Sequence, residues 1–401
     1  MLAVLGVLAS FAMIVTLRLR NVDFSLSILT GSLIIAVTSV NTFMVLLEAA
    51  HLTLTDYNTL NLSMAVALIS ILGYSLKVTG MMTDLIEGLR GLLPARVFLA
   101  AIPAMFGLLT MPGGALMSAP FNDPEGDRLG LNPEQKTYIN IWFRHLWYWA
   151  SPLSPILILT ASMAGFSVTE YLYAQLPLLV VVLVIGFLVG GTFIRDERFG
   201  RRSTGGLGIV ARGLSPIATA ILLTLIGVPV WLALVPAIAL VFLLRRVQLS
   251  EAMDIAKSGV RWDLTTAAVS MFFFRFVVAS SGSVVALFDS AMGLGVPLIA
   301  ILVVVPLLAG SISGTPTMGV GMILPLLLPL LGKYGIYVVS MIYVGLIAGY
   351  IASPMHLCLI LTNSYYKSEL SRVYRYLVPS TIVLYLVAMA YYIFRNGGIP
   401  A

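Results

Sequence analysis

The chain has 401 residues, of which 59% are hydrophobic and 10% are charged. Apolar runs of about 20 residues, the length that crosses a bilayer, recur along the whole sequence, which excludes a soluble protein. The formal charge of +6 does not indicate nucleic acid as a partner, because the Lys and Arg lie in short loops that orient a membrane protein. The single cysteine, Cys358, excludes an internal disulfide.

In chain order, the apolar runs predict an all-α polytopic protein of the lipid bilayer. No basic residue precedes the first run, so it is expected to be a transmembrane helix and not a cleaved signal. The expected helices are residues 2–17, 25–47, 62–80, 137–166, 171–194, 207–227, 229–244, 264–282, 335–363 and 376–394.

Charge in the loops predicts the orientation. Placing Arg18 and Arg20 in the cytoplasm places the other basic segments there too, at 195–202, 245–261 and 365–375. Segments 48–61 and 283–295 contain no Lys or Arg and are expected outside. The prediction is a multi-pass protein of the cytoplasmic (inner) membrane with both termini outside.

Two apolar segments, 96–120 and 296–331, fit this alternation only if they do not cross the membrane. Each is interrupted by small and helix-breaking residues, LLTMPGGALMSAP (108–120) in the first and GSISGTPTMGVGMILP (310–325) in the second. Non-helical backbone at membrane depth is tolerated only where protein or a water-filled cavity satisfies it. Both segments are therefore predicted to be re-entrant helical hairpins.

The chain also contains an internal duplication. Shifted by 202 residues, WASPLSPILILT (149–160) matches IASPMHLCLILT (351–362), and a shift of 203 places Gly107 on Gly310. Five spanning helices and one hairpin in each half give an odd number of crossings, so the copies are expected to be inverted. The expected units are repeat 1 (1–194), a cytoplasmic linker (195–206) and repeat 2 (207–401).

Both copies carry a Ser-Pro pair inside a predicted span, where proline breaks the helix and is expected to leave backbone groups free for a solute. Half-helices that begin after such breaks direct positive dipole ends at one place, which favours an anion. The expected substrate-binding residues are Thr110, Pro112, Gly113, Gly114, Ser151, Pro152, Ser154, Arg275, Ser313, Gly314, Thr315, Thr317, Ser353, Pro354, His356 and Asn363. A coupling Na⁺ could be held by Thr110, Ser151, Ser313 and Ser353.

Charged residues at membrane depth are costly and often functional. Arg275 could neutralise an anionic substrate or pair with carbonyls at a helix contact, and His356 could donate to the substrate, carry a proton or pack structurally. Arg144 and His145 are expected to snorkel to the cytoplasmic face. Three scattered histidines and one cysteine show no metal-ligand spacing, so no metal centre or other cofactor is expected beyond Na⁺ or H⁺ as coupling ion.

Other functions remain open. A cation/proton antiporter normally needs a midplane carboxylate, and the predicted helix interiors contain no Asp or Glu. A passive channel of the same fold is an alternative, although two gating hairpins favour alternating access. An intramembrane hydrolase using serine and histidine is a weaker alternative, because no third orienting residue is evident; no catalytic residue is assigned.

Two inverted repeats, each with a small-residue hairpin tip and a helix broken at Ser-Pro, resemble the ion-transporter superfamily. It includes dicarboxylate/sodium symporters, gluconate permeases and lactate permeases, and the chain looks most like an uncharacterised branch. The Ser-Asn-Thr tips of the dicarboxylate symporters are replaced here by residues 110–114 and 313–317. The resemblance implies an elevator mechanism and a homodimer. The sequence thus predicts a secondary active transporter, not an enzyme, for a small organic anion such as a carboxylate, coupled to Na⁺ or H⁺.

Overall fold

The described part of the chain is all-α, which confirms the predicted fold class. The computed structural model describes residues 2–20, 22–108, 114–193, 206–283, 286, 295, 297–331 and 335–398, and no strand occurs among them. Six of the described helices are long and apolar enough to cross a membrane. The chain is a polytopic helical membrane protein.

The first half of the chain runs through α1 (Leu2–Leu19), α2 (Phe24–Val37), α3 (Thr42–Thr55), α4 (Tyr57–Val78), α5 (Met81–Arg90), α6 (Ala95–Leu108), α7 (Gly114–Arg128), α8 (Pro133–Arg144), the 3₁₀ helix η1 (His145–Tyr148), α9 (Pro155–Ala164) and α10 (Val168–Gly191). The second half runs through α11 (Gly206–Leu225), α12 (Val230–Arg245), α13 (Leu249–Gly259), α14 (Trp262–Ser281), α16 (Leu298–Ser313), α17 (Pro316–Leu331), α18 (Ile336–Ala352), α19 (Leu357–Tyr366) and α20 (Leu370–Arg395).

The structure differs from the sequence prediction near the N-terminus. The single helix predicted over 25–47 is two helices, α2 and α3, because Asn41 starts a new helix by accepting a hydrogen bond from the Met44 amide. Most of segment 48–61, predicted as a loop, is helical, and Asp56 caps α4 by accepting from the Thr59 amide at 2.8 Å. The amphipathic helix α5 was not predicted.

Two consecutive helices of the first half have counterparts at the same spacing in the second. Helix α9 begins at Pro155 and α19 at Leu357, and α10 begins at Val168 and α20 at Leu370, so both pairs are offset by 202 residues. Each half breaks one helix at a Ser-Pro pair: α8 and η1 stop before α9, and α18 stops before α19.

Tight helix contacts are also repeated. A Cβ added at Gly107 in α6 would lie 2.0 Å from the Arg144 carbonyl oxygen, and one at Gly310 in α16 would lie 2.0 Å from the Leu346 carbonyl oxygen. Only glycine permits backbones to approach this closely. The first helix of each hairpin is therefore held against the broken helix of its own half.

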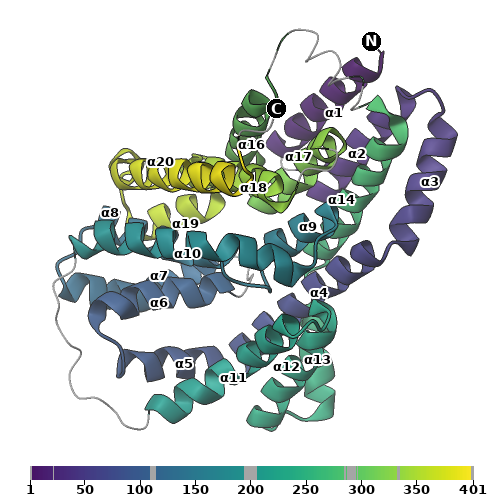
Figure 1. The fold of residues 1–401 in the computed structure, drawn as a ribbon. Coiled ribbons are helices and arrows are strands. Elements are labelled where there is room, and N and C mark those ends of the chain that lie inside the picture. Colours follow the sequence, from purple (N-terminus) through teal and green to yellow (C-terminus); the bar gives the residue numbers. More distant parts are fainter. Residues whose placement is uncertain are drawn as a thin grey trace.

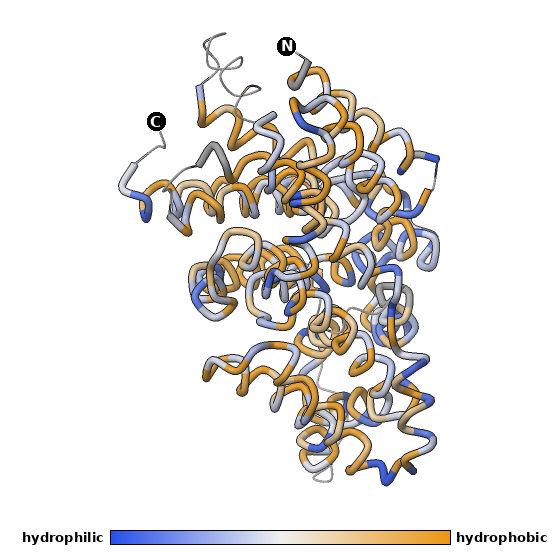
Figure 2. The backbone as a smooth tube through the Cα atoms, turned by 90° about the vertical axis from the view of Figure 1, so that its right-hand side faces the viewer, coloured by the Kyte–Doolittle hydropathy of each residue, from blue (hydrophilic) through white to orange (hydrophobic). Residues whose placement is uncertain are grey.

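Helices α6, α7, α8, α10, α19 and α20 lie alongside one another on one side of the molecule, and α1, α2, α3 and α14 group on the other (Figure 1). The two halves interlock, because α17 packs on α9 and α7 packs on α19. The helices consist mostly of hydrophobic residues, and the more hydrophilic segments lie mainly at helix ends and turns (Figure 2).

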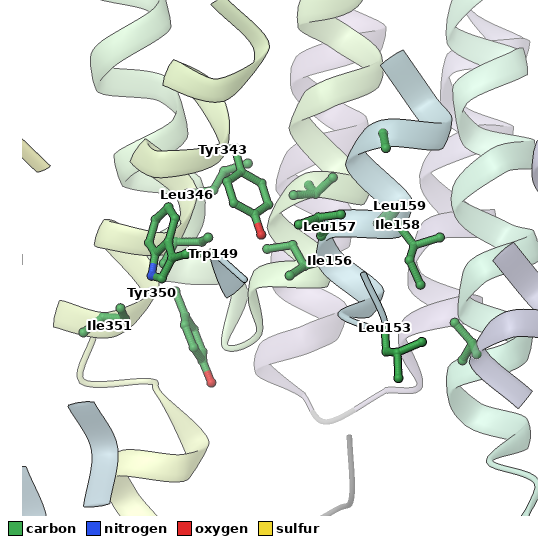
Figure 3. Close-up of a cluster of buried hydrophobic side chains, with 14 of the residues drawn as sticks. Trp149, Leu153, Ile156, Leu157, Ile158, Leu159, Tyr343, Leu346, Tyr350 and Ile351 are labelled. Carbon is green, nitrogen blue, oxygen red and sulfur yellow. The ribbon is translucent and has the colours of Figure 1, made fainter. Parts of the chain in front are cut away.

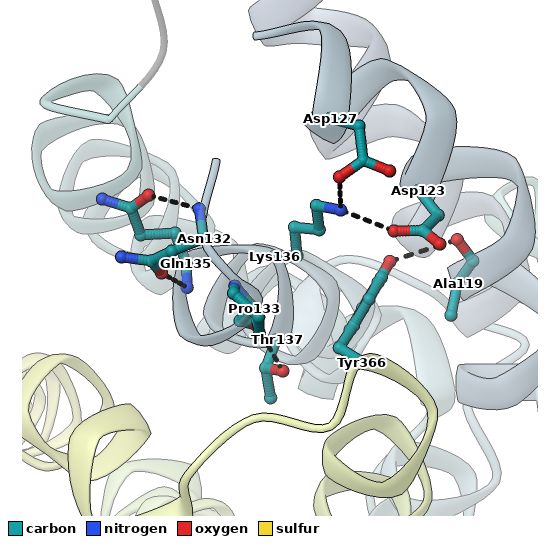
Figure 4. Close-up of polar contacts among 9 residues, drawn as sticks. All are labelled: Ala119, Asp123, Asp127, Asn132, Pro133, Gln135, Lys136, Thr137 and Tyr366. Carbon is teal, nitrogen blue, oxygen red and sulfur yellow. Dashed lines mark hydrogen bonds and ion pairs between the residues drawn. The ribbon is translucent and has the colours of Figure 1, made fainter. Parts of the chain in front are cut away.

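A polar network fixes the start of the first broken helix (Figure 4). The buried ammonium of Lys136 in α8 binds Asp123 of α7 at 2.6 Å and also binds Asp127. Burial alone lowers the pKa of Lys136, but the two carboxylates outweigh it and raise that pKa above its ordinary value. The ammonium is therefore fully charged at neutral pH, and its contribution to stability is lost as the pH rises through the raised pKa.

Candidate functional site

The first break, residues 149–154, is a turn in which several backbone groups are hydrogen-bonded within the protein. The Ser151 hydroxyl accepts from the Leu153 amide at 3.1 Å, and the Ser154 amide donates to the Ser151 carbonyl at 3.1 Å. Helix α9 then begins with proline at its first position, where a missing N–H costs nothing.

The second break, residues 353–356, has the same hydrogen bonds 202 residues later. The Ser353 hydroxyl accepts from the Met355 amide at 3.0 Å, and the His356 amide donates to the Ser353 carbonyl at 3.2 Å. In addition, the Ser353 hydroxyl donates to the Ser311 carbonyl of α16, which ties this break to the second hairpin.

The expectation that these turns leave backbone groups free for a solute is therefore wrong for the bonded groups. A serine two residues before each amide satisfies it locally, as such side chains commonly do in turns. The Tyr148 carbonyl at the start of the first break accepts from the Tyr343 hydroxyl of α18 at 2.6 Å. Figure 3 shows Tyr343 beside Trp149 and the hydrophobic side chains of α9.

The tip of the second hairpin lies next to the second break. Gly314 has φ +69°, a left-handed conformation that glycine adopts readily, and a Cβ there would lie 3.8 Å from the Met355 carbonyl oxygen. The Ser313 hydroxyl donates to the Thr315 carbonyl at 2.9 Å, and the Thr315 hydroxyl accepts from the Met318 amide. The tip is thus held by its own side chains.

A cavity of about 380 Å³ lies where this tip meets the helix that follows the first break. The N-termini of α9 and α17, one from each half of the chain, both open on it through Pro155, Thr315 and Thr317. Other lining residues come from α1, α4, α14 and the two broken helices: Arg18, Leu62, Val66, Tyr148, Met271 and Tyr350.

Of the predicted site residues, Thr315 and Thr317 line this cavity. Ser154 precedes the lining residue Pro155; its buried hydroxyl has no hydrogen-bond partner in the part of the chain that the structure describes. Pro152 and Pro354 form the two turns. Asn363 lies in the last turns of α19, where its side-chain oxygen accepts from Ser368 at 2.6 Å.

Three arginines take different positions. Arg18 of α1 lines the cavity and donates to the Val22 carbonyl. Arg275 of α14 lies over the rings of Phe272 and Phe276, 5.6 and 5.3 Å from their centroids, and does not line this cavity, so its substrate role stays a prediction. Arg144 is only 9% exposed, so the snorkelling predicted for it is wrong.

The tip of the first hairpin, with Thr110, Pro112 and Gly113, lies outside the described residues. Gly114 begins α7. The Na⁺ ligands predicted from Thr110, Ser151, Ser313 and Ser353 therefore stay a prediction; of these, the last three hydroxyls already have backbone partners.

Sequence reasoning missed a second cluster behind the cavity wall. The prediction that the histidines and the cysteine are scattered is wrong for His145, His356 and Cys358, whose ligand atoms lie within 4.8 Å of one another. The duplication contained a usable signal, because it aligns Tyr148 with Tyr350, and the rings of both tyrosines contact this cluster.

Comparison with known proteins adds a family and a fold. Residues 2–394 match a family described as "Protein of unknown function (DUF401)". No curated protein matches the chain. The fold is similar to that in "Crystal structure of the Alcanivorax borkumensis YdaH transporter reveals an unusual topology", with a TM-score of 0.61, 14% identity and 89% of each chain covered.

Proposed function

The chain belongs to the DUF401 family, and we propose that it is a secondary active transporter for a small organic anion of the carboxylate class, coupled to Na⁺ or H⁺. Its fold resembles that of a protein described as a transporter. At 14% identity this likeness concerns the fold alone, so the substrate class is argued from the cavity.

The observation that carries the proposal is that two helix N-termini, one from each half of the chain, open on one cavity. The first amides of a helix have no partner within it, and the helix dipole adds partial positive charge there. Both α9 and α17 begin with proline, so the first amide donors that point out of the helix ends are those of Ile156 and Thr317; the next amide of α17, at Met318, donates to the Thr315 hydroxyl. Two such ends make a site for a carboxylate.

The charges in the cavity wall agree with an anionic ligand. Asp23 accepts hydrogen bonds from the Ser25 and Leu26 amides, and Asp263 pairs with Arg261, so both lining carboxylates already have partners. Arg18 donates to a carbonyl and has no carboxylate partner within 4 Å among the described residues. Its positive charge therefore remains available to an anion.

The arrangement of the helices supports an elevator mechanism as part of the proposal. The hairpins and broken helices would form a transport domain, and α1–α4 with α11–α14 would form the scaffold on which it slides. The cavity would then lie between the two parts, since its wall includes α1, α4 and α14 on one side and α9, α17 and α18 on the other. A homodimer stays a prediction.

Ligand-dependent thermal unfolding of the purified protein tests the substrate class. We expect a member of a panel of succinate, citrate, gluconate and lactate to raise the unfolding temperature, because a ligand that binds only the folded state stabilises it. If Na⁺ is the coupling ion, replacing it with choline should weaken this effect. If cations raise the unfolding temperature and none of the carboxylates does, the protein would be a cation antiporter instead.

Two half-buried arginines provide a matched pair of variants. Arg18→Gln should weaken carboxylate binding by about 10–100-fold, the loss of a charge-assisted hydrogen bond of about 1.5–3 kcal/mol. Arg275→Gln removes an equal charge from outside the cavity wall and should leave the affinity unchanged. The opposite result would assign the countercharge to Arg275.

A further inference from the structure

His145, His356 and Cys358 converge from both broken helices. His145 belongs to η1 before the first break, and the other two begin α19 after the second break. The two imidazole rings lie 4.8 Å apart, and both histidines are at most 3% exposed. Such a group of side chains at membrane depth is costly unless it has a role.

The ring nitrogens are arranged as in metal sites. Nδ1 of His145 donates to the Ile141 carbonyl at 2.6 Å, and the imidazole is also hydrogen-bonded to the Cys358 thiol, so the Nε2 lone pair points into the cluster. Nδ1 of His356 faces the Ile351 carbonyl at 3.5 Å, and its Nε2 is buried without a hydrogen-bond partner in the described part of the chain. A ligating histidine typically donates its other N–H to a carbonyl in this way.

We propose that His145, His356 and Cys358 form a three-ligand site for a thiophilic transition-metal ion of the Zn²⁺ type, which bridges the broken helices of the two halves. Two imidazoles and a thiolate suit Zn²⁺ and exclude hard ions such as Mg²⁺ or Ca²⁺. A tetrahedral ion with bonds of about 2.0–2.3 Å needs ligand atoms about 3.5 Å apart, so the three side chains must move inward by about 1 Å.

Metal binding to these three side chains releases one proton and leaves a small net charge. The Cys358 thiol loses its proton to solvent as the metal–sulfur bond forms, and both imidazoles bind through neutral nitrogens. A divalent ion and one thiolate leave a net charge of +1. Three protein ligands leave a fourth tetrahedral position for water or an anion, as in sites that exchange ligands.

The half-buried side chain of Cys358 and the nearby cavity provide an access route. The Tyr350 ring lines the cavity and also lies 4.0 Å from the His356 ring, and its hydroxyl faces the Cys358 sulfur at 3.9 Å. Tyr148, which also lines the cavity and whose ring lies 5.2 Å from the His145 ring, and Tyr350 therefore separate the cavity from the cluster. A histidine that binds metal cannot also carry the coupled proton, so this site and the proton-carrier role exclude each other.

Binding of Co²⁺ and Zn²⁺ to purified protein tests the proposal without a transport assay, so its outcome is independent of the proposed substrate. After chelator treatment, we expect the protein to take up one equivalent of Zn²⁺ by elemental analysis. Co²⁺ should produce a thiolate-to-metal charge-transfer absorption, which requires a cysteine ligand.

Variants locate the ion. Cys358→Ser should abolish the charge-transfer absorption, and His145→Ala and His356→Ser should each weaken Zn²⁺ binding at least 10–100-fold, because even outer-shell changes cost about that much. The third histidine of the sequence, His51, is exposed, and His51→Ala should leave Zn²⁺ binding unchanged.

Size-exclusion profiles establish that the variants fold. In the unmodified chain, Zn²⁺ should protect Cys358 from alkylation. Absence of this absorption and of protection, or equal binding in the variants, would overturn the proposal.

Discussion

The two breaks have the same backbone hydrogen bonds but different side chains. In both, a serine hydroxyl accepts a hydrogen bond from the amide two residues later, and the carbonyl of the same serine accepts one from the amide three residues later. The fourth residue of the turn is Ser154 in the first break and His356 in the second. The second break is followed by a thiol, Cys358, and the first is preceded by a carbonyl, that of Tyr148, which accepts a hydrogen bond from Tyr343 of the other half.

This difference separates what holds the turn from what acts on a solute. The serine of each break gives one amide a partner where a helix stops inside the membrane, because an exposed amide needs a partner there. The fourth position makes none of these side-chain bonds and is therefore free to differ. We infer that the duplicated residues maintain the fold and that the unmatched ones, including Arg18, carry the specific chemistry.

The largest expected effect tests whether the two halves are equivalent in packing. Gly107→Ala and Gly310→Ala should each cost more than about 3 kcal/mol of folding free energy, because the new Cβ meets a backbone carbonyl that cannot move aside. Gly191→Ala is the control: no atom lies within 4 Å of its added Cβ, and the change should stay within about 0.5 kcal/mol. Thermal unfolding in detergent measures all three, and tolerance of either tight variant would break the equivalence.

A smaller effect distinguishes the two serines. Ser151→Ala should cost about 1–3 kcal/mol, because it leaves the buried Leu153 amide without a partner. Ser353→Ala should cost more, since the Ser311 carbonyl loses its donor as well. The exposed Ser250 provides the control substitution. Equal losses at both positions would show that the tie to the second hairpin contributes nothing to stability.

The smallest effect concerns Tyr343, whose hydroxyl donates to the carbonyl just before the first break. Tyr343→Phe removes the hydrogen bond to the Tyr148 carbonyl and should cost about 1 kcal/mol of folding free energy. A shift of 202 residues places Tyr343 on Ile141, so the first half offers no counterpart. Tyr57→Phe at an exposed position is the control. An unchanged unfolding temperature would mean that water replaces the tyrosine at this carbonyl.

The sequence predicted the helical class and both helix breaks, because hydropathy and Ser-Pro pairs act locally. It did not predict the split into α2 and α3, where a single Asn41 cap overrides a continuous apolar run. The site was predicted less completely. Thr315 and Thr317 follow from the tip motif, whereas Arg18 reaches the cavity only through tertiary packing. His145 and Cys358 lie 213 residues apart, and only the folded chain brings them together.

Solute counterflow in proteoliposomes tests the central claim, a saturable carrier for a carboxylate, most directly. Vesicles loaded with unlabelled succinate, citrate, gluconate or lactate should accumulate the labelled form of the transported one above its equilibrium level, because a carrier exchanges solute without net flux. Arg18→Gln should raise the half-saturating concentration about 10-fold or more. Labelled uptake that never exceeds equilibrium with any of the four, or that rises linearly with concentration, would contradict a carboxylate carrier and indicate a passive pore or another substrate class.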